Sequence, residues 1–168
     1  MKPHNQPRCP VCDMEVTHEH YTTVYQQMNF VFCSAQCRDN FTAHPHLYIG
    51  MHGQKAPRQE GEEAIKRRRI HLARSPDAAE ETGLRDALSR LMGIKDVVFE
   101  RDCIAIFYDL LQVTEAQIET ALVDAGARLG SGWSERLRRG WVHYAEETQL
   151  ESMEVTPSTC CNRPPTGR

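Results

Sequence analysis

The sequence predicts an α+β protein with two small domains, a C-terminal helix and a short tail. Four of the seven cysteines lie in the first 37 residues, in two close pairs. From Ile70 onward, apolar residues recur with strand and helix periods in the order β-α-β-β-α-β. Between these parts, residues 51–69 are polar and contain Gly, Pro and charges of both signs, which is typical of a linker.

These changes in composition divide the chain into five parts. We expect a cysteine-rich domain, a linker, a ferredoxin-like sandwich, a helix and a flexible tail, over residues 1–50, 51–69, 70–131, 132–155 and 156–168 respectively. The tail contains Cys160 and Cys161, is punctuated by prolines and has no core-forming pattern.

The sandwich is predicted to begin with a strand over residues 70–73, followed by a helix. Ser75 is the expected helix cap, Pro76 suits the first helical position, and Gly93 ends the helix. Five apolar residues form one face of this helix: Leu84, Ala87, Leu88, Leu91 and Met92.

A hairpin and a second helix complete the predicted sandwich. Residues 96–109 are rich in β-branched and aromatic residues and have a polar break at 100–102, which predicts two strands. Thr114 and Gln117 form a capping box, and Gly126 closes the helix. Its buried stripe is expected to be Ile118, Ala121, Leu122 and Ala125. A short strand over 127–129 would complete the ferredoxin-like order.

Residues 133–153 are predicted to form the C-terminal helix. Leu137, Trp141 and Tyr144 or Ala145 lie on one side of it, and Gly140 lowers its helix propensity.

The charge distribution argues against bulk binding to nucleic acid or membranes. The net charge is −3, and no stretch approaches 18 apolar residues, so we expect no membrane span. The basic run Lys66–Arg69 is interpreted as a solvated stretch before a strand, with a phosphate or partner contact as the alternative. The first residues lack an apolar core, so we expect no secretory signal and a cytoplasmic location.

The cysteine spacing predicts one closed metal site. Two residues separate Cys9 from Cys12, so one tight turn can direct both sulfurs at one ion. The second pair lies at a strand-to-helix junction, with Cys33 at the strand end, Ser34 as the cap and Cys37 in the first turn. This is the arrangement of a treble-clef-like zinc knuckle. Because so short a domain buries little core, a metal would supply much of its folding energy.

Two alternatives to a metal site remain at this point, namely redox thiols and unrelated buried thiols. Four thiolates favour structural zinc, although soft sulfur also suits Cu(I). Candidate auxiliary ligands are His18, His20, Cys160 and Cys161. Three further histidines flank the site and are expected to be exposed to solvent: His44, His46 and His52.

The cysteine-rich segment resembles the YHS domain, a relative of the TRASH group of metal-binding modules. Over residues 8–49 the matching positions are Pro10, Val11, Cys12, Met14, Val16, Phe32, Cys33, Ser34, Cys37, Phe41, Pro45 and Tyr48. The resemblance implies that Cys12, Cys33 and Cys37 are metal-site cysteines and that Met14 packs in the core. Such domains often accompany heavy-metal-transporting P-type ATPases, so it also implies a heavy-metal transporter as the partner.

Two residues depart from the YHS pattern. Cys9 stands where the family has aspartate, which makes a four-sulfur site that retains its ion. Asp13 stands where the family has glycine, so the turn is expected to differ.

Residues 70–129 resemble the heavy-metal-associated domain, which is ferredoxin-like. That family carries two cysteines after its first strand, but residues 73–83 contain none. The resemblance therefore implies a degenerate copy used for docking. Cys103, on the predicted hairpin, is expected to be a small strand residue.

No catalytic motif is present, so we do not expect an enzyme. The expected function is that of a zinc- or copper-binding accessory protein in metal handling. The rival is a structural-zinc module that binds protein or nucleic acid through the basic runs Lys66–Arg69 and Arg136–Arg139. A thiol-redox protein is the third alternative.

Overall fold

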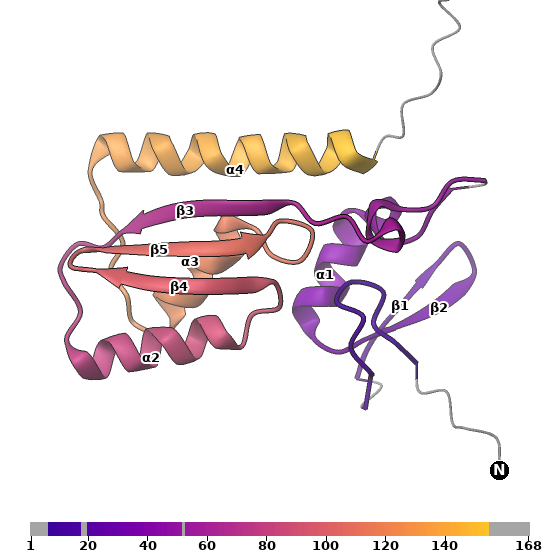
Figure 1. Cartoon of the computed structure of the whole chain (residues 1–168), viewed down its shortest axis with the longest axis horizontal. Helices are drawn as coiled ribbons and strands as arrows, with labels where there is room; N and C mark the ends of the chain where they lie inside the picture. The colour runs from indigo at the N-terminus through magenta and orange to yellow at the C-terminus, as the bar shows by residue number, and fades with distance from the viewer. Residues whose placement is uncertain (1–6, 18–19, 52, 155–168) are drawn as a thin grey trace, which may run out of the picture.

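A computed structural model of the chain describes residues 7–17, 20–51 and 53–154. Within them the α+β class is confirmed, because helices accompany two antiparallel sheets. The cysteine-rich part lies at one end of the larger sheet, and the C-terminal helix runs along that sheet (Figure 1).

The cysteine-rich part is a hairpin followed by a helix. Its elements are β1 (Tyr21–Tyr25), β2 (Met28–Phe32), α1 (Ala35–Ala43) and a 3-10 helix (Pro45–Leu47). Gln26 and Gln27 both have positive φ, as a two-residue hairpin turn of the favoured twist requires. The small core is aromatic: the fully buried ring of Phe41 lies 4.7 Å from that of Phe30 and 5.2 Å from that of Phe32.

The second part is a three-stranded sheet with helices on one face. Its elements are β3 (Ile65–His71), α2 (Ala78–Ser89), β4 (Ile94–Glu100), β5 (Cys103–Asp109), α3 (Glu115–Asp124) and α4 (Trp133–Glu154), preceded by a 3-10 helix (Pro57–Glu60). The strands pair antiparallel in the order β3-β5-β4. In Figure 1, α3 lies behind the sheet, and no described helix lies in front of it.

Three predicted elements have different bounds in the structure. The first strand of the sheet starts at Ile65, so the basic run lies inside β3 and not before it. Helix α2 starts at Ala78, because the Asp77 carboxylate caps it by accepting from two backbone amides at 2.9 and 2.8 Å. The predicted last strand is reduced to a single bridge between Leu72 and Leu129.

Other local predictions are confirmed. The hairpin turns at residues 101–102, and the capping box of Thr114 and Gln117 opens α3. The predicted end of the first helix at Gly93 is wrong, because α2 ends at Ser89 and leaves Leu91 and Met92 outside it. Gly93 lies in the turn that follows, with φ of 94°, and a Cβ there would lie 2.6 Å from that of Gln112. Only glycine fits this close approach.

Helix α4 places its apolar stripe outward. Leu137, Trp141 and Tyr144 share one side as predicted, but that side faces solvent. The opposite side carries the buried residues Glu146 and Leu150. No helix among the described residues has the length and apolar character needed to cross a membrane.

Candidate metal centre

The first cysteine pair lies in a tight turn closed by backbone hydrogen bonds. The amide of Cys9 donates to the carbonyl of Met14 at 2.9 Å, and the amide of Asp13 donates to the carbonyl of Cys9 at 2.9 Å. Asp13 has a φ of 63°, in the left-handed region where glycine is favoured. Aspartate tolerates this conformation better than most residues, so the turn accommodates it. Its side chain forms an exposed ion pair with Arg8 at 2.8 Å.

The second pair lies at the junction of β2 and α1, as the spacing predicts. Cys33 follows the last residue of β2, and Cys37 lies in the first turn of α1. The Oγ of Ser34 accepts from the amide of Cys37 at 3.2 Å and so caps the helix. The partial positive charge at this helix end favours thiolates.

The structure brings all four cysteines together. Their Sγ atoms lie within 4.8 Å of one another, with 3.3 Å from Cys12 to Cys33 and 3.6 Å from Cys33 to Cys37. Zinc–sulfur bonds of about 2.3 Å in a tetrahedron place the sulfurs about 3.8 Å apart. Small shifts would therefore let the four sulfurs hold one ion. Among the described residues, no other group of three or more metal-binding side chains has such spacing.

The clustered thiols change one another's acidity. Hydrogen bonds from Cys12 and Cys37 lower the pKa of Cys9 far below its ordinary value. Contacts with Cys12 and Cys9, together with burial, raise the pKa of Cys37 far above it. The hydrogen bond with Cys37 lowers the pKa of Cys12, but Cys9 and burial outweigh it and raise this pKa to about 12. One thiolate is thus favoured and further thiolates repel it, so a soft or borderline cation fits this donor set.

One edge of the cluster faces solvent. Cys9 and Cys37 are buried, whereas Cys12 and Cys33 are half-buried. Met14, whose amide hydrogen-bonds to Cys12, is 52% exposed, so the expectation that it packs in the core is wrong. Only the backbone amide of Met14 contacts the cluster among the interactions described for it, and the accessible edge is that of Cys12 and Cys33.

The candidate auxiliary ligands do not join this cluster within the described residues. His20 is exposed and is not part of the four-cysteine group. His18, Cys160 and Cys161 lie outside the described residues, as does His52, so the predictions for them stay predictions.

The expectation of an exposed His44 is wrong. Its Nδ1 lies 3.2 Å from the Glu154 carboxylate and its Nε2 lies 3.2 Å from that of Glu147. The amide of His46 also donates to Glu154 at 2.9 Å. The C-terminal end of α4 therefore binds the segment that follows α1. No local sequence signal predicts this contact, because the partners are about a hundred residues apart.

The helix that carries Cys37 is docked on the second part of the chain. Between the last two cysteines, the amide nitrogen of Gln36 donates to the carbonyls of Met92 at 3.0 Å and Gln112 at 2.8 Å. Its amide oxygen accepts from the backbone of Met92 at 3.1 Å. One turn later, Asn40 donates to the same Gln112 carbonyl at 2.5 Å. Helix α1 therefore carries both Cys37 and the hydrogen bonds that join the two parts of the chain.

We expect Gln36→Ala to loosen this contact. Three hydrogen bonds of about 1 kcal/mol each are lost, so the free energy of unfolding should fall by about 2–3 kcal/mol. Hydrogen exchange should rise in α1 and in residues 90–93. The exposed Gln54→Ala is the matched control and should change neither quantity. Unchanged exchange in the Gln36 variant would contradict the coupling.

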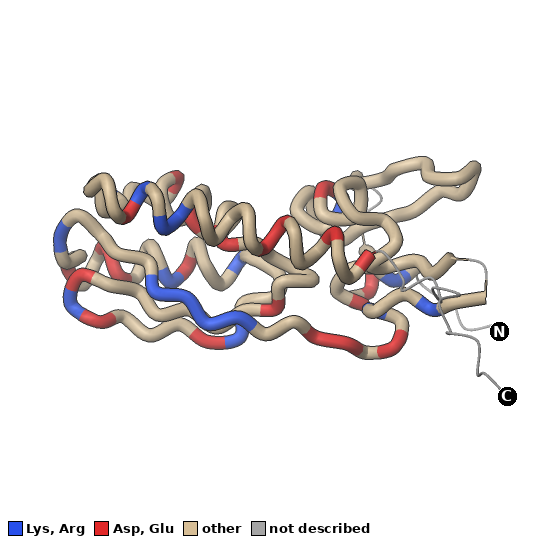
Figure 2. Tube along the Cα trace, turned by 90° about the horizontal axis from the view of Figure 1, so that it is seen from above, with Lys and Arg blue, Asp and Glu red and all other residues tan. Residues whose placement is uncertain are grey.

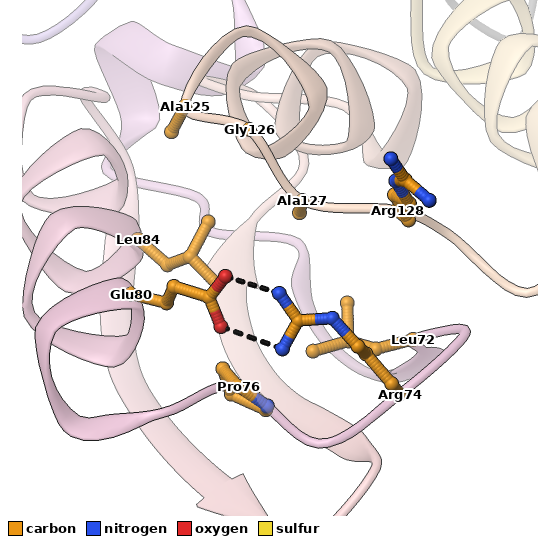
Figure 3. A pocket seen from close by; sticks show the side chains of 9 residues that line it. All are labelled: Leu72, Arg74, Pro76, Glu80, Leu84, Ala125, Gly126, Ala127 and Arg128. Carbon is orange, nitrogen blue, oxygen red and sulfur yellow. Dashed lines mark hydrogen bonds and ion pairs between the residues drawn. The ribbon is translucent and has the colours of Figure 1, made fainter.

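The loop that follows β3 lines a small pocket of about 140 Å³ (Figure 3). An exposed bidentate ion pair between Arg74 and Glu80 spans it, and the Arg74 guanidinium holds the pKa of Glu80 below its ordinary value. Its other lining residues are Leu72, Pro76, Leu84, Ala125, Gly126, Ala127 and Arg128. No thiol lines the pocket, so the loop offers no soft metal ligand there.

The two basic runs are largely engaged inside the molecule. In β3 (the blue stretch in Figure 2), Lys66 hydrogen-bonds to Gln149, and Arg68 lies 3.3 Å from the buried carboxylate of Glu115. In α4, Arg138 and Arg139 pair with carboxylates of α3 and α4. Arg67, Arg69 and Arg136 remain exposed, and Arg69 pairs at the surface with Glu100 at 3.2 Å.

Cys103 is a buried residue of β5, as expected, and burial raises the pKa of its thiol. It is not part of the four-cysteine group.

Comparison with protein families agrees with the site. Residues 8–51 match the family model described as the YHS domain. The match contains all four clustered cysteines and leaves residues 52–168 outside it. Searches of curated proteins and of solved structures found no match.

Proposed function

We propose that the four cysteines bind one metal ion, with Zn(II) as the expected metal and Cu(I) as the alternative. The protein then acts as a heavy-metal-binding accessory protein in metal handling, trafficking or detoxification. The observation that carries this proposal is the convergence of four Sγ atoms within 4.8 Å, on a tight turn and a helix N-terminus. The YHS match over residues 8–51 supports it independently. A bound ion would neutralise the thiolates and cross-link the turn to the helix.

The burial of the sulfurs bears on whether the ion is retained. Cys9 supplies a fourth, buried thiolate, which favours retention over exchange. Cys12 and Cys33 are the accessible pair, so exchange with another thiol would start on their side.

The second part of the chain is proposed to dock a transporter or another protein, without catalysis of its own. We infer that residues 65–129 are a ferredoxin-like unit. The strand order β3-β5-β4 and the Leu72–Leu129 bridge on the free edge of β3 support this inference. The absence of cysteine from residues 73–83, which form the loop after β3 and the first turns of α2, supports docking over a second metal site.

Elemental analysis of the purified protein tests the proposal. We expect about one zinc or copper ion per chain, as for a single closed four-sulfur site. Cys103→Ser removes a buried cysteine outside the cluster and should leave the metal content unchanged. A reduced protein that contains no metal and takes up neither Zn(II) nor Cu(I) would contradict it.

Cys9→Asp tests retention. A carboxylate oxygen is a harder and weaker ligand for these ions than a thiolate, so the variant should still bind metal but transfer it to a chelator about tenfold faster or more. The measurement is the rate of transfer from protein loaded with one ion, with Cys103→Ser as the control. A transfer rate equal to that of the unaltered protein would show that Cys9 does not hold the ion.

A further inference from the structure

The outer side of α4 carries an apolar stripe that the rest of the described chain does not cover. The stripe consists of Trp133, Leu137, Trp141 and Tyr144, which are 74%, 55%, 71% and 66% exposed. Their spacing of four, four and three residues keeps them on one side of the helix. A contiguous apolar patch of this kind on a soluble domain marks an interaction site.

Gly140 lies on the same outer side, between the turns of Leu137 and Tyr144. A Cβ at this position would meet nothing within 4 Å, so packing within the chain does not require a glycine. Glycine in the middle of a helix lowers helix stability relative to alanine. Its presence is explained if another backbone approaches α4 closely at this point.

The charges of α4 are segregated along its length. Arg136 is exposed in the N-terminal half, whereas Glu147 and Glu151 are exposed in the C-terminal half. Two copies of α4 in parallel would place like charges together. Two antiparallel copies that cross at Gly140 place the Arg136 half of one helix beside the acidic half of the other, which carries Glu151 and also Glu147, whose carboxylate lies 3.2 Å from His44. The same crossing sets Leu137 opposite Tyr144 and Trp141 over Gly140, so the face is complementary to itself.

We propose that the outer face of α4 is the interface of a twofold-symmetric dimer in which two α4 helices cross antiparallel at Gly140. Each contact then occurs twice, as an isologous interface requires. Aromatic side chains present about 150–250 Å² each, so the stripe can bury roughly 400–600 Å² per copy. A stable interface buries about 800 Å² per partner, so this dimer is of modest strength, with a dissociation constant on the order of micromolar.

Analytical ultracentrifugation of the reduced full-length chain tests this dimer. From roughly 1 to 200 μM, we expect a monomer–dimer equilibrium. Trp141→Glu removes an aromatic contact twice per dimer and should raise the dissociation constant about 100-fold or more. Gly140→Leu should weaken the dimer similarly by blocking close approach, while its helical circular dichroism equals or exceeds that of the unaltered chain. Val123→Glu, at a 51% exposed apolar position of α3, is the control and should leave the equilibrium unchanged.

Three outcomes would overturn the proposal. The first is sedimentation as a monomer at every concentration. The second is a dimer that survives both Trp141→Glu and Gly140→Leu, because the interface would then lie elsewhere. The third is a monomer whose tryptophan fluorescence shifts to the blue with vesicles of anionic lipid, which would assign the stripe to a membrane surface. Metal content and circular dichroism of each variant establish that it is folded.

Discussion

Cys37→Ser should yield a protein that retains no zinc and whose residues 8–51 exchange their amide hydrogens freely. The module has only a small aromatic core around Phe41, so the ion must supply much of its stability. Structural zinc contributes about 10–16 kcal/mol in small zinc-binding peptides, which is comparable to the whole stability of an ordinary domain. Hydrogen exchange read by mass spectrometry, on the variant and on chelator-treated protein, measures the loss region by region.

Two comparisons make this result specific. Cys103→Ser should keep both its metal and the protection of residues 8–51, because its thiol lies outside the cluster. Strands β3, β4 and β5 should stay protected in the Cys37 variant, because their buried residues pack with one another and with α2 and α3. If metal-free protein kept residues 8–51 protected, the ion would not be structural, and binding for exchange would be the better interpretation.

Arg68→Met should lower the free energy of unfolding by about 3–5 kcal/mol at pH 8. Without the guanidinium, the buried carboxylates beside it have lost a cation that compensates their charge. Arg68 lies 3.3 Å from the Glu115 carboxylate and 3.7 Å from that of Glu146, and both carboxylates are buried. Arg67→Met is the matched control on the same strand, because that side chain is exposed and lies over the ring of Phe107. Denaturant unfolding of both variants measures the difference.

The cost of Arg68→Met should depend on pH. Burial, followed by the charge of Glu146, raises the pKa of Glu115 from 4.5 to about 7. The folded state therefore binds the Glu115 proton more tightly than the unfolded state. This group stabilises the fold fully below about pH 4.5, and the contribution of about 3 kcal/mol is lost as the pH rises to about 7.

In the variant, a proton can replace the missing cation on Glu115 at low pH. The cost of Arg68→Met should therefore be smaller at pH 5.5 than at pH 8, and comparison of variant with unaltered protein at each pH cancels the acid sensitivity of the metal site. A cost independent of pH, or an equal cost for Arg67→Met, would contradict the assignment of Arg68 to this buried cluster.

Local chemistry in the sequence determined much of the fold and most of the candidate site. The capping box of Thr114 and Gln117 and the turn after Glu100 depend on residues that are close in the sequence, so both can be predicted without the fold. The cysteine spacing is similarly local within each pair. Each pair supplies only two of the four thiolates that a closed metal site needs. The sequence therefore predicted that the two pairs meet, and the structure brings their sulfurs together.

Only the tertiary structure decided which polar residues lie inside. The sequence predicted that the basic run of β3 is exposed to solvent. In the structure, Arg68 instead forms ion pairs with carboxylates of helices α3 and α4. With those contacts, the side of α4 that carries Glu146 faces the sheet and its aromatic side faces solvent. Hydrophobicity alone predicts the opposite orientation, with the aromatic side buried. Gln36 and His44 also find their partners far along the chain. The physical reason is that a buried charge or amide is stable only beside a matching group, and the fold alone supplies that group.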